Sequence, residues 1–87
     1  MKVRNRPRLD VQTLAEELLI RRRRLGLTQQ ALAEASGVSL ALIKRIESAN
    51  AAGIGVNNLL CLCDVLGCSI GDVAKPMKTD VGQELHV

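Results

Sequence analysis

Apolar residues recur at helical spacing along most of this chain, and short stretches with glycine or proline separate the periodic segments. The first segment begins after Asp10, a suitable N-cap residue, and runs to about Arg24, just before Gly26. Its inward face consists of Val11, Leu14, Ala15, Leu18 and Leu19. Further helices are predicted over 29–35, 40–48, 56–66 and 70–74. The pattern predicts an all-α fold with a basic arm at 1–9, a helical domain at 10–75 and a tail at 76–87.

The segment from 29 to 48 predicts two short helices joined by a sharp turn at 36–38. Thr28 and Ser39 are suitable N-caps, and Gly37 suits a backbone with positive φ. On the second helix the apolar residues Val38, Ile43 and Ile46 share one face. The residues expected to point away from the core are Leu40, Ala41, Lys44 and Arg45. Two helices joined by so short a turn are typical of a helix-turn-helix, which reads duplex DNA.

Five short motifs make this resemblance specific. They are Leu25-Gly26-Leu27-Thr28-Gln29, Leu32-Ala33, Gly37-Val38-Ser39, Ile43-x-x-Ile46-Glu47 and Leu66-Gly67-Cys68-Ser69-Ile70. From about residue 18 to residue 73 the chain resembles the Cro and phage-repressor helix-turn-helix family, also called Xre-type regulators. The resemblance implies a compact five-helix, lambda-repressor-like domain. It also implies a homodimer that binds double-stranded DNA and regulates transcription as a repressor, with helix 39–48 in the major groove.

The resemblance and the chemistry of the side chains together suggest the DNA-contacting residues. The residues expected to read bases are Ser39, Leu40, Ala41, Lys44 and Arg45, and those expected at phosphates are Thr28, Gln29, Gln30 and Arg24. Arg45 is suited to donate two parallel hydrogen bonds to guanine. Leu40 and Ala41 depart from the family pattern, since an apolar side chain contacts only thymine methyl groups, or a protein. The resemblance also implies a structural ion pair between Arg22 and Glu47.

Composition narrows the functional class. The 87 residues suffice for one domain, and 47% are apolar although Phe, Trp and Tyr are absent. Modules for single-stranded nucleic acid usually stack bases on aromatic rings, so duplex DNA is the better partner. The net charge is +3, but eight of the twelve basic residues fall within the first 24. With no apolar run long enough for a membrane span or a signal peptide, we expect a cytoplasmic protein.

The cysteines and the absence of catalytic patterns argue against other chemistry. Cys61 and Cys63 are two residues apart on a predicted helix and project to nearly opposite sides, so they cannot chelate one ion. Cys63 is expected to be buried and Cys61 exposed, while Cys68 follows the helix. No Ser/His/Asp set, carboxylate pair or phosphate-binding glycine loop occurs. We therefore predict no enzyme activity, no metal and no cofactor.

Three alternatives remain open at this stage. An antitoxin would bind DNA and also a toxin partner, with the tail Lys78–Val87 supplying a contact. A protein-interaction module would keep the fold without binding an operator, consistent with Leu40, Ala41 and an uncharged connector at 49–55. A thiol switch would act through Cys61. Contacts between the two copies of a homodimer are expected at the helix 70–74 and neighbouring residues, such as Ile70 and Val73, by analogy with relatives.

Overall fold

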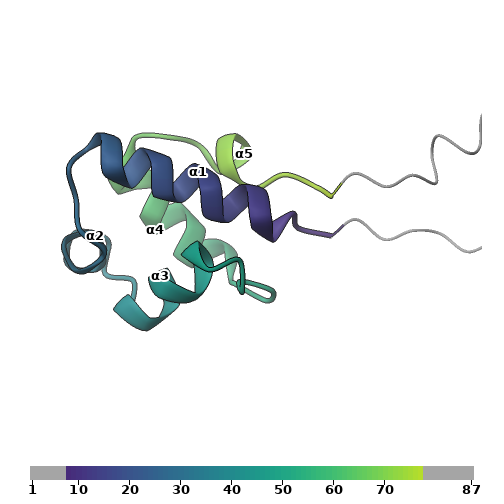
Figure 1. The fold of residues 1–87 in the computed structure, drawn as a ribbon, viewed down its shortest axis with the longest axis horizontal. Helices are drawn as coiled ribbons and strands as arrows, with labels where there is room; N and C mark the ends of the chain where they lie inside the picture. Colours follow the sequence, from purple (N-terminus) through teal and green to yellow (C-terminus); the bar gives the residue numbers. More distant parts are fainter. Residues whose placement is uncertain (1–7, 78–87) are drawn as a thin grey trace, which may run out of the picture.

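The computed structural model describes residues 8–77, which form five α-helices around one core (Figure 1). The helices are α1 (Val11–Arg24), α2 (Gln29–Ser36), α3 (Leu40–Glu47), α4 (Val56–Leu66) and α5 (Ile70–Val73). The predicted all-α fold class is confirmed, and the predicted helix ends differ from those observed by at most one residue. Figure 1 shows α1 along one side of the molecule, with α3 and α4 across from it and α5 beside it.

Local capping explains where α1 begins and ends. The Asp10 carboxylate accepts the Thr13 backbone N–H at 3.0 Å and the Thr13 hydroxyl at 2.8 Å. These hydrogen bonds favour the ionised carboxylate and lower the pKa of Asp10. At the other end, Gly26 takes a left-handed backbone with φ of 72°. The four arginines of the last turn stand at the negative end of the helix dipole.

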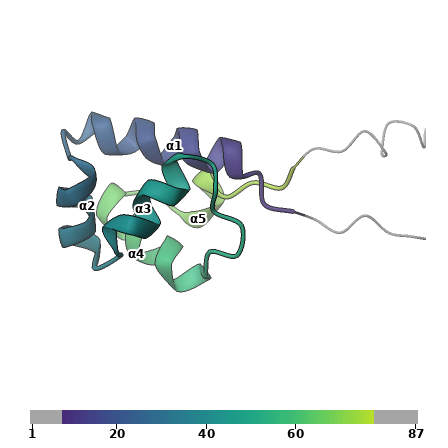
Figure 2. The ribbon, with the colours of Figure 1, turned by 60° about the horizontal axis from the view of Figure 1, so that its bottom comes forward.

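The turn between α2 and α3 is built by short polar side chains and one glycine. Thr28 Oγ1 accepts the Ala31 N–H at 2.9 Å, and Ser39 Oγ accepts the Leu42 N–H at 3.1 Å. Gly37 has a φ of 78°, as the sequence predicted. Ser36 adds a contact that was not predicted, because its hydroxyl donates to the Leu32 carbonyl at 2.7 Å. The same oxygen accepts the Val38 N–H at 3.1 Å, which fixes the turn. Figure 2 shows α2 and α3 crossing at a steep angle.

Aliphatic side chains from all five helices fill the core, which contains no aromatic ring. The largest fully buried side chains are Leu14, Leu18, Leu32, Ile43, Ile46, Leu62 and Val73. Helix α1 contacts α3 and α5, whereas α2 contacts α3 and α4. On the predicted inward face of α1, Leu14, Ala15 and Leu18 are buried, and Leu19 is only half-buried.

The connector between α3 and α4 contributes to the core in a way the sequence did not predict. Ala51 is 0% exposed. Ala49 takes a left-handed backbone with φ of 62°, which is unusual for a residue with a Cβ atom. Its N–H donates to the Ile46 carbonyl at 3.0 Å, and the Asn50 N–H donates to the Arg45 carbonyl at 2.8 Å. These bonds form a Schellman motif, which ends α3 with alanine in the usual glycine position.

The two ends of the described chain lie side by side next to the N-terminus of α1 (Figures 1 and 2). Leu9 and Pro76 form an antiparallel bridge. The Asp10 N–H donates to the Lys75 carbonyl and the Met77 N–H donates to the Arg8 carbonyl, each at 2.8 Å. Leu9 also packs against the core. The predicted boundaries after residues 9 and 75 therefore lie inside a short ladder that joins the arm to the tail.

Candidate nucleic-acid interface

Helix α3 has one buried face and one exposed face. Ile43 and Ile46 are buried, whereas Lys44 and Arg45 are exposed. Ser39 and Ala41, at the start of the helix, are also exposed. Leu40 is half-buried, although the sequence placed it away from the core. Within residues 8–77, neither Lys44 nor Arg45 forms an ion pair, so both cations face solvent without a carboxylate partner.

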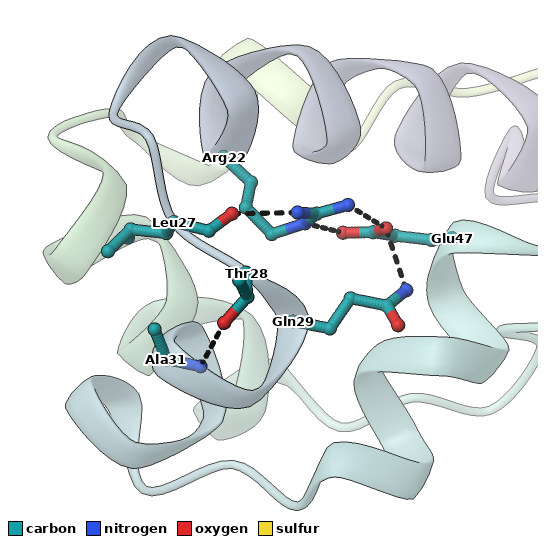
Figure 3. Close-up of polar contacts among 6 residues, drawn as sticks. All are labelled: Arg22, Leu27, Thr28, Gln29, Ala31 and Glu47. Carbon is teal, nitrogen blue, oxygen red and sulfur yellow. Dashed lines mark hydrogen bonds and ion pairs between the residues drawn. The ribbon is translucent and has the colours of Figure 1, made fainter.

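A polar network joins α3 to the elements beside it (Figure 3). The Arg22 guanidinium binds the Glu47 carboxylate through two bonds, Nε to Oε2 at 2.7 Å and Nη2 to Oε1 at 2.9 Å. Its Nη1 donates to the Leu27 carbonyl at 2.7 Å. The Gln29 amide Nε2 donates to Glu47 Oε1 at 2.9 Å. One carboxylate at the end of α3 is therefore shared by side chains from α1 and α2.

The burial of this network allows it to fix the position of α3. The Arg22 and Glu47 side chains are only 10% and 6% exposed. The hydrogen bond with Glu47 raises the pKa of Arg22 above its ordinary value. Two charges so far removed from water hold a defined geometry, because separating them would leave each without its partner. The ion pair that the resemblance implied is thus present, and it fixes α3 against α1 and α2.

Gln29 has a partner that sequence reasoning missed. We expected its side chain at a phosphate, and the structure shows its amide donating to the Glu47 carboxylate. The two roles are compatible, since a primary amide carries two N–H donors and Glu47 uses one. The missed signal is the pairing of a Gln at the start of one helix with a Glu at the end of the next, which only the crossing of α2 and α3 brings together.

The other residues expected at phosphates lie near the N-terminus of α2. Thr28 is exposed, and its oxygen accepts the Ala31 N–H, so its hydroxyl hydrogen is still available to donate. Gln30 is exposed and donates to Glu34 Oε2 at 2.9 Å. Arg24 is exposed at the end of α1. Thr28 and Gln30 lie at the N-terminus of α2, where backbone N–H groups and the helix dipole favour an anion.

The N-terminus of α4 differs from those of α1, α2 and α3. Asp10, Thr28 and Ser39 cap the first three helices through side-chain oxygens. The N-cap of α4 is Gly55, which has no side chain and makes no such bond. Among the described residues no side chain caps this end of α4, so its first-turn N–H groups are suited to bind a phosphate oxygen.

The expected dimer contact at Val73 is wrong. Val73 is 0% exposed, because the short helix α5 turns its apolar side chain into the core against α1 and α4. Ile70, the other expected contact, is half-buried and packs against the core. The large apolar residues that remain exposed in the described chain are Ile20, Leu25, Val56, Leu60 and Met77.

The burial predicted for Cys61 and Cys63 agrees with the structure, and no burial was predicted for Cys68. Cys61 is exposed and Cys63 is buried, while Cys68 is half-buried. In the part of the chain that the structure describes, no three His, Cys, Asp or Glu side chains are arranged to hold a metal ion. No helix within residues 8–77 is long and apolar enough to cross a membrane.

Comparison with known families accounts for this arrangement of helices. The family model described as the Cro/C1-type HTH DNA-binding domain matches residues 17–78, which is well over half of the chain. The chain belongs to the Cro/C1-type helix-turn-helix family. This result confirms the resemblance drawn from the five motifs and identifies DNA as the partner of the Cro/C1-type domain. Among curated proteins, none matches the chain significantly.

Proposed function

We propose that this Cro/C1-type protein is a sequence-specific transcriptional regulator that represses by occupying an operator as a homodimer. The observation that carries the proposal is the geometry of α3. Its apolar face is buried at Ile43 and Ile46, and its opposite face exposes Lys44 and Arg45. The Glu47 carboxylate, at the last residue of the helix, binds Arg22. A helix held by a buried ion pair, with two exposed cations that pair with no carboxylate within residues 8–77, suits insertion into a major groove.

In this proposal the exposed face of α3 reads bases. Arg45 donates two parallel hydrogen bonds to one guanine, and Lys44 donates to a base or a phosphate. Ser39 donates its hydroxyl, and Ala41 contacts a thymine methyl group. Leu40 is half-buried, so it offers only part of its surface to a base.

Phosphate contacts in the proposal set the register of α3 on the duplex. The second N–H of Gln29, the Thr28 hydroxyl, Gln30 and Arg24 meet one strand at the start of α2. The uncapped first turn of α4 meets a phosphate through backbone N–H groups. The connector at 49–55 has no charged side chain, so fewer phosphates are neutralised there and the salt dependence of binding is shallow.

The proposed dimer places two copies of α3 roughly 34 Å apart, one helical turn, on a pseudo-palindrome. Since Val73 is buried, we propose that the two copies contact each other through Ile70 and through exposed apolar residues. The exposed apolar residues are Ile20, Leu25, Val56, Leu60 and Met77. We propose a cytoplasmic location, where the DNA is, and no catalytic role. Sedimentation of the free protein and of its DNA complex tests the dimer. A single copy in both samples would contradict it.

The proposed function is tested by titrating the protein into fluorescently labelled duplexes. One duplex carries the region upstream of its own gene and the other a scrambled sequence, each at two salt concentrations. The chain has no Trp, so the label belongs on the DNA. We expect tighter binding to the native duplex that persists at the higher salt. Equal and weak binding to both duplexes that higher salt abolishes would contradict sequence-specific regulation.

A second candidate function is a protein-interaction module on the same fold. The apolar residues Leu40 and Ala41 at the start of α3 and the uncharged connector at 49–55 favour it. An antitoxin would combine both activities, with its toxin contact in the tail at 78–87, outside the described residues. Binding to neither duplex would favour the interaction module. Preference for the native duplex together with co-purification of one neighbouring gene product would favour the antitoxin.

A further inference from the structure

Cys63 and Cys68 meet at the joint between α4 and α5, a part of the molecule that the proposed DNA contacts do not use. Gly67 ends α4 with a left-handed backbone, φ of 73°, and the Cys68 N–H donates to the Cys63 carbonyl at 3.0 Å. This hydrogen bond is the 6→1 hydrogen bond of a Schellman motif. The two residues joined by that bond usually bring their side chains into contact, commonly as an apolar pair. Here both positions are cysteine.

The surroundings of the two thiols support such a contact. Cys63 is 3% exposed and belongs to the core, and the half-buried Cys68 packs against that core. Burial raises the pKa of the Cys63 thiol to about 12, and the neighbouring Cys68 thiol contributes to the rise. The neighbouring carboxylate of Asp72 acts in the same direction.

We propose that Cys63 and Cys68 form a redox-active dithiol that oxidises to an intramolecular disulfide and joins the end of α4 to the start of the α5 segment. The inference is independent of the proposed DNA binding. Cys61 has no part in the pair, because it lies roughly 200° around the helix from Cys63 and is exposed.

The oxidant is a small-molecule disulfide such as glutathione disulfide. Cys68, the more exposed thiol of the pair, attacks as its thiolate, forms a mixed disulfide and releases the first glutathione thiolate. Cys63 then loses its proton and attacks the Cys68 sulfur, which forms the internal disulfide and releases the second glutathione thiolate. The two cysteines are oxidised, the glutathione disulfide is reduced, and the two protons pass to the released thiolates. An excess of glutathione reverses both steps.

The closing of this disulfide acts on α5. That helix begins at Ile70, two residues after Cys68, and Val73 anchors it in the core. Its N-terminus is held by the Ser69 N–H, which donates to the Asp72 carboxylate at 2.9 Å. A covalent bond from Cys68 to α4 adds a second constraint on the start of α5. We expect the oxidised protein to unfold at a higher temperature than the reduced protein.

The test equilibrates the full chain with defined ratios of glutathione to glutathione disulfide. Free thiols are then alkylated after an acid quench, and the products are identified by mass. Cleavage on the N-terminal side of Asp64 separates Cys68 from Cys61 and Cys63, so a disulfide from Cys68 links two fragments. The wild type and Cys61→Ser should each show this link with the loss of two hydrogen atoms. Cys68→Ser should show no intramolecular link.

Two results would overturn the proposal. One is that all three thiols of the wild type are alkylated at every ratio. The other is that the link to Cys68 disappears in Cys61→Ser, which would assign the disulfide to Cys61. Cys61→Ser and Cys68→Ser change an exposed and a half-buried side chain, so we expect both variants to fold. The same equilibration of the wild type in concentrated urea supplies a further test. We expect the native chain to become half-oxidised under more reducing conditions than the unfolded chain. If the native chain became half-oxidised at the same glutathione ratio as the unfolded chain, or only under more oxidising conditions, the fold would not favour the disulfide.

Discussion

At the scale of single residues, Ala49 is the position where the backbone and the side chain conflict. Its left-handed conformation ends α3, yet an L-residue with a Cβ atom costs about 1–2 kcal/mol there. The surrounding hydrogen bonds and the buried Ala51 hold it in place.

We predict that Ala49→Gly stabilises the protein by about 0.5–1 kcal/mol, because glycine removes the clash but has more freedom in the unfolded chain. Urea unfolding measures the change. Ala52→Gly is the matched control, since Ala52 lies in the same connector with an ordinary negative φ and should be neutral or destabilising. Equal effects of the two substitutions would contradict the assignment of strain to Ala49.

Asp10 gives a prediction about pH. Its pKa is lowered in the folded chain, so its stabilising effect is complete above the unfolded pKa of about 4 and is lost as the pH falls through the folded pKa. Asp10→Asn keeps an N-cap that does not titrate. We expect the stability difference between wild type and this variant to shrink in acid, as measured by urea unfolding from pH 7 downward. A difference that stays constant with pH would contradict the cap.

At the scale of the helices, the Arg22–Glu47–Gln29 network decides how α3 is presented. We predict that Glu47→Ala costs about 3 kcal/mol or more, because it leaves the buried Arg22 without its carboxylate. Glu17→Ala is the control, since the Glu17–Arg21 pair is more exposed and is worth about 0.5 kcal/mol or less. Urea unfolding measures both, and similar losses would mean that the network is not important for stability.

A paired substitution separates the worth of the ion pair from the cost of leaving one charge alone. The double variant Arg22→Met with Glu47→Leu removes both charges and retains apolar volume. We expect it to lose less stability than Glu47→Ala alone, although it also frees Gln29 and the Leu27 carbonyl. A loss equal to the sum of the losses of Arg22→Met alone and Glu47→Leu alone would indicate no coupling between the two residues.

The helices also show how far sequence reasoning reaches. Asp10, Thr28 and Ser39 were predictable as caps, because each acts on an N–H group three residues away in the sequence. The Gln29–Glu47 bond and the Leu9–Pro76 bridge depend on how distant segments cross, which spacing alone does not give. Val73 was expected at a dimer contact by analogy with relatives, and a helix of four residues is too short for its periodicity to correct that expectation.

At the scale of the whole molecule, the described chain separates two sets of features. The proposed DNA contacts lie on α2, α3 and the ends of their neighbours, whereas the two chain ends meet beside the N-terminus of α1. The arm residue Arg8 and the tail residue Met77 are hydrogen-bonded to each other at 2.8 Å. The two ends of the described chain, at residues 8 and 77, therefore lie at one place on the domain.

The central claim is that the exposed face of α3 reads a DNA sequence, and selection from a pool of randomised duplexes tests it most directly. The wild type, Arg45→Ala and Lys75→Ala are selected in parallel, the last being a control that removes an exposed cation far along the chain from α3. We predict that the wild type and the control enrich the same motif of two related half-sites. Arg45→Ala should lose the preference for one base pair in each half-site, a loss of about 1–3 kcal/mol in discrimination. Enrichment of an unchanged motif by Arg45→Ala, or of no motif by the wild type, would contradict the account.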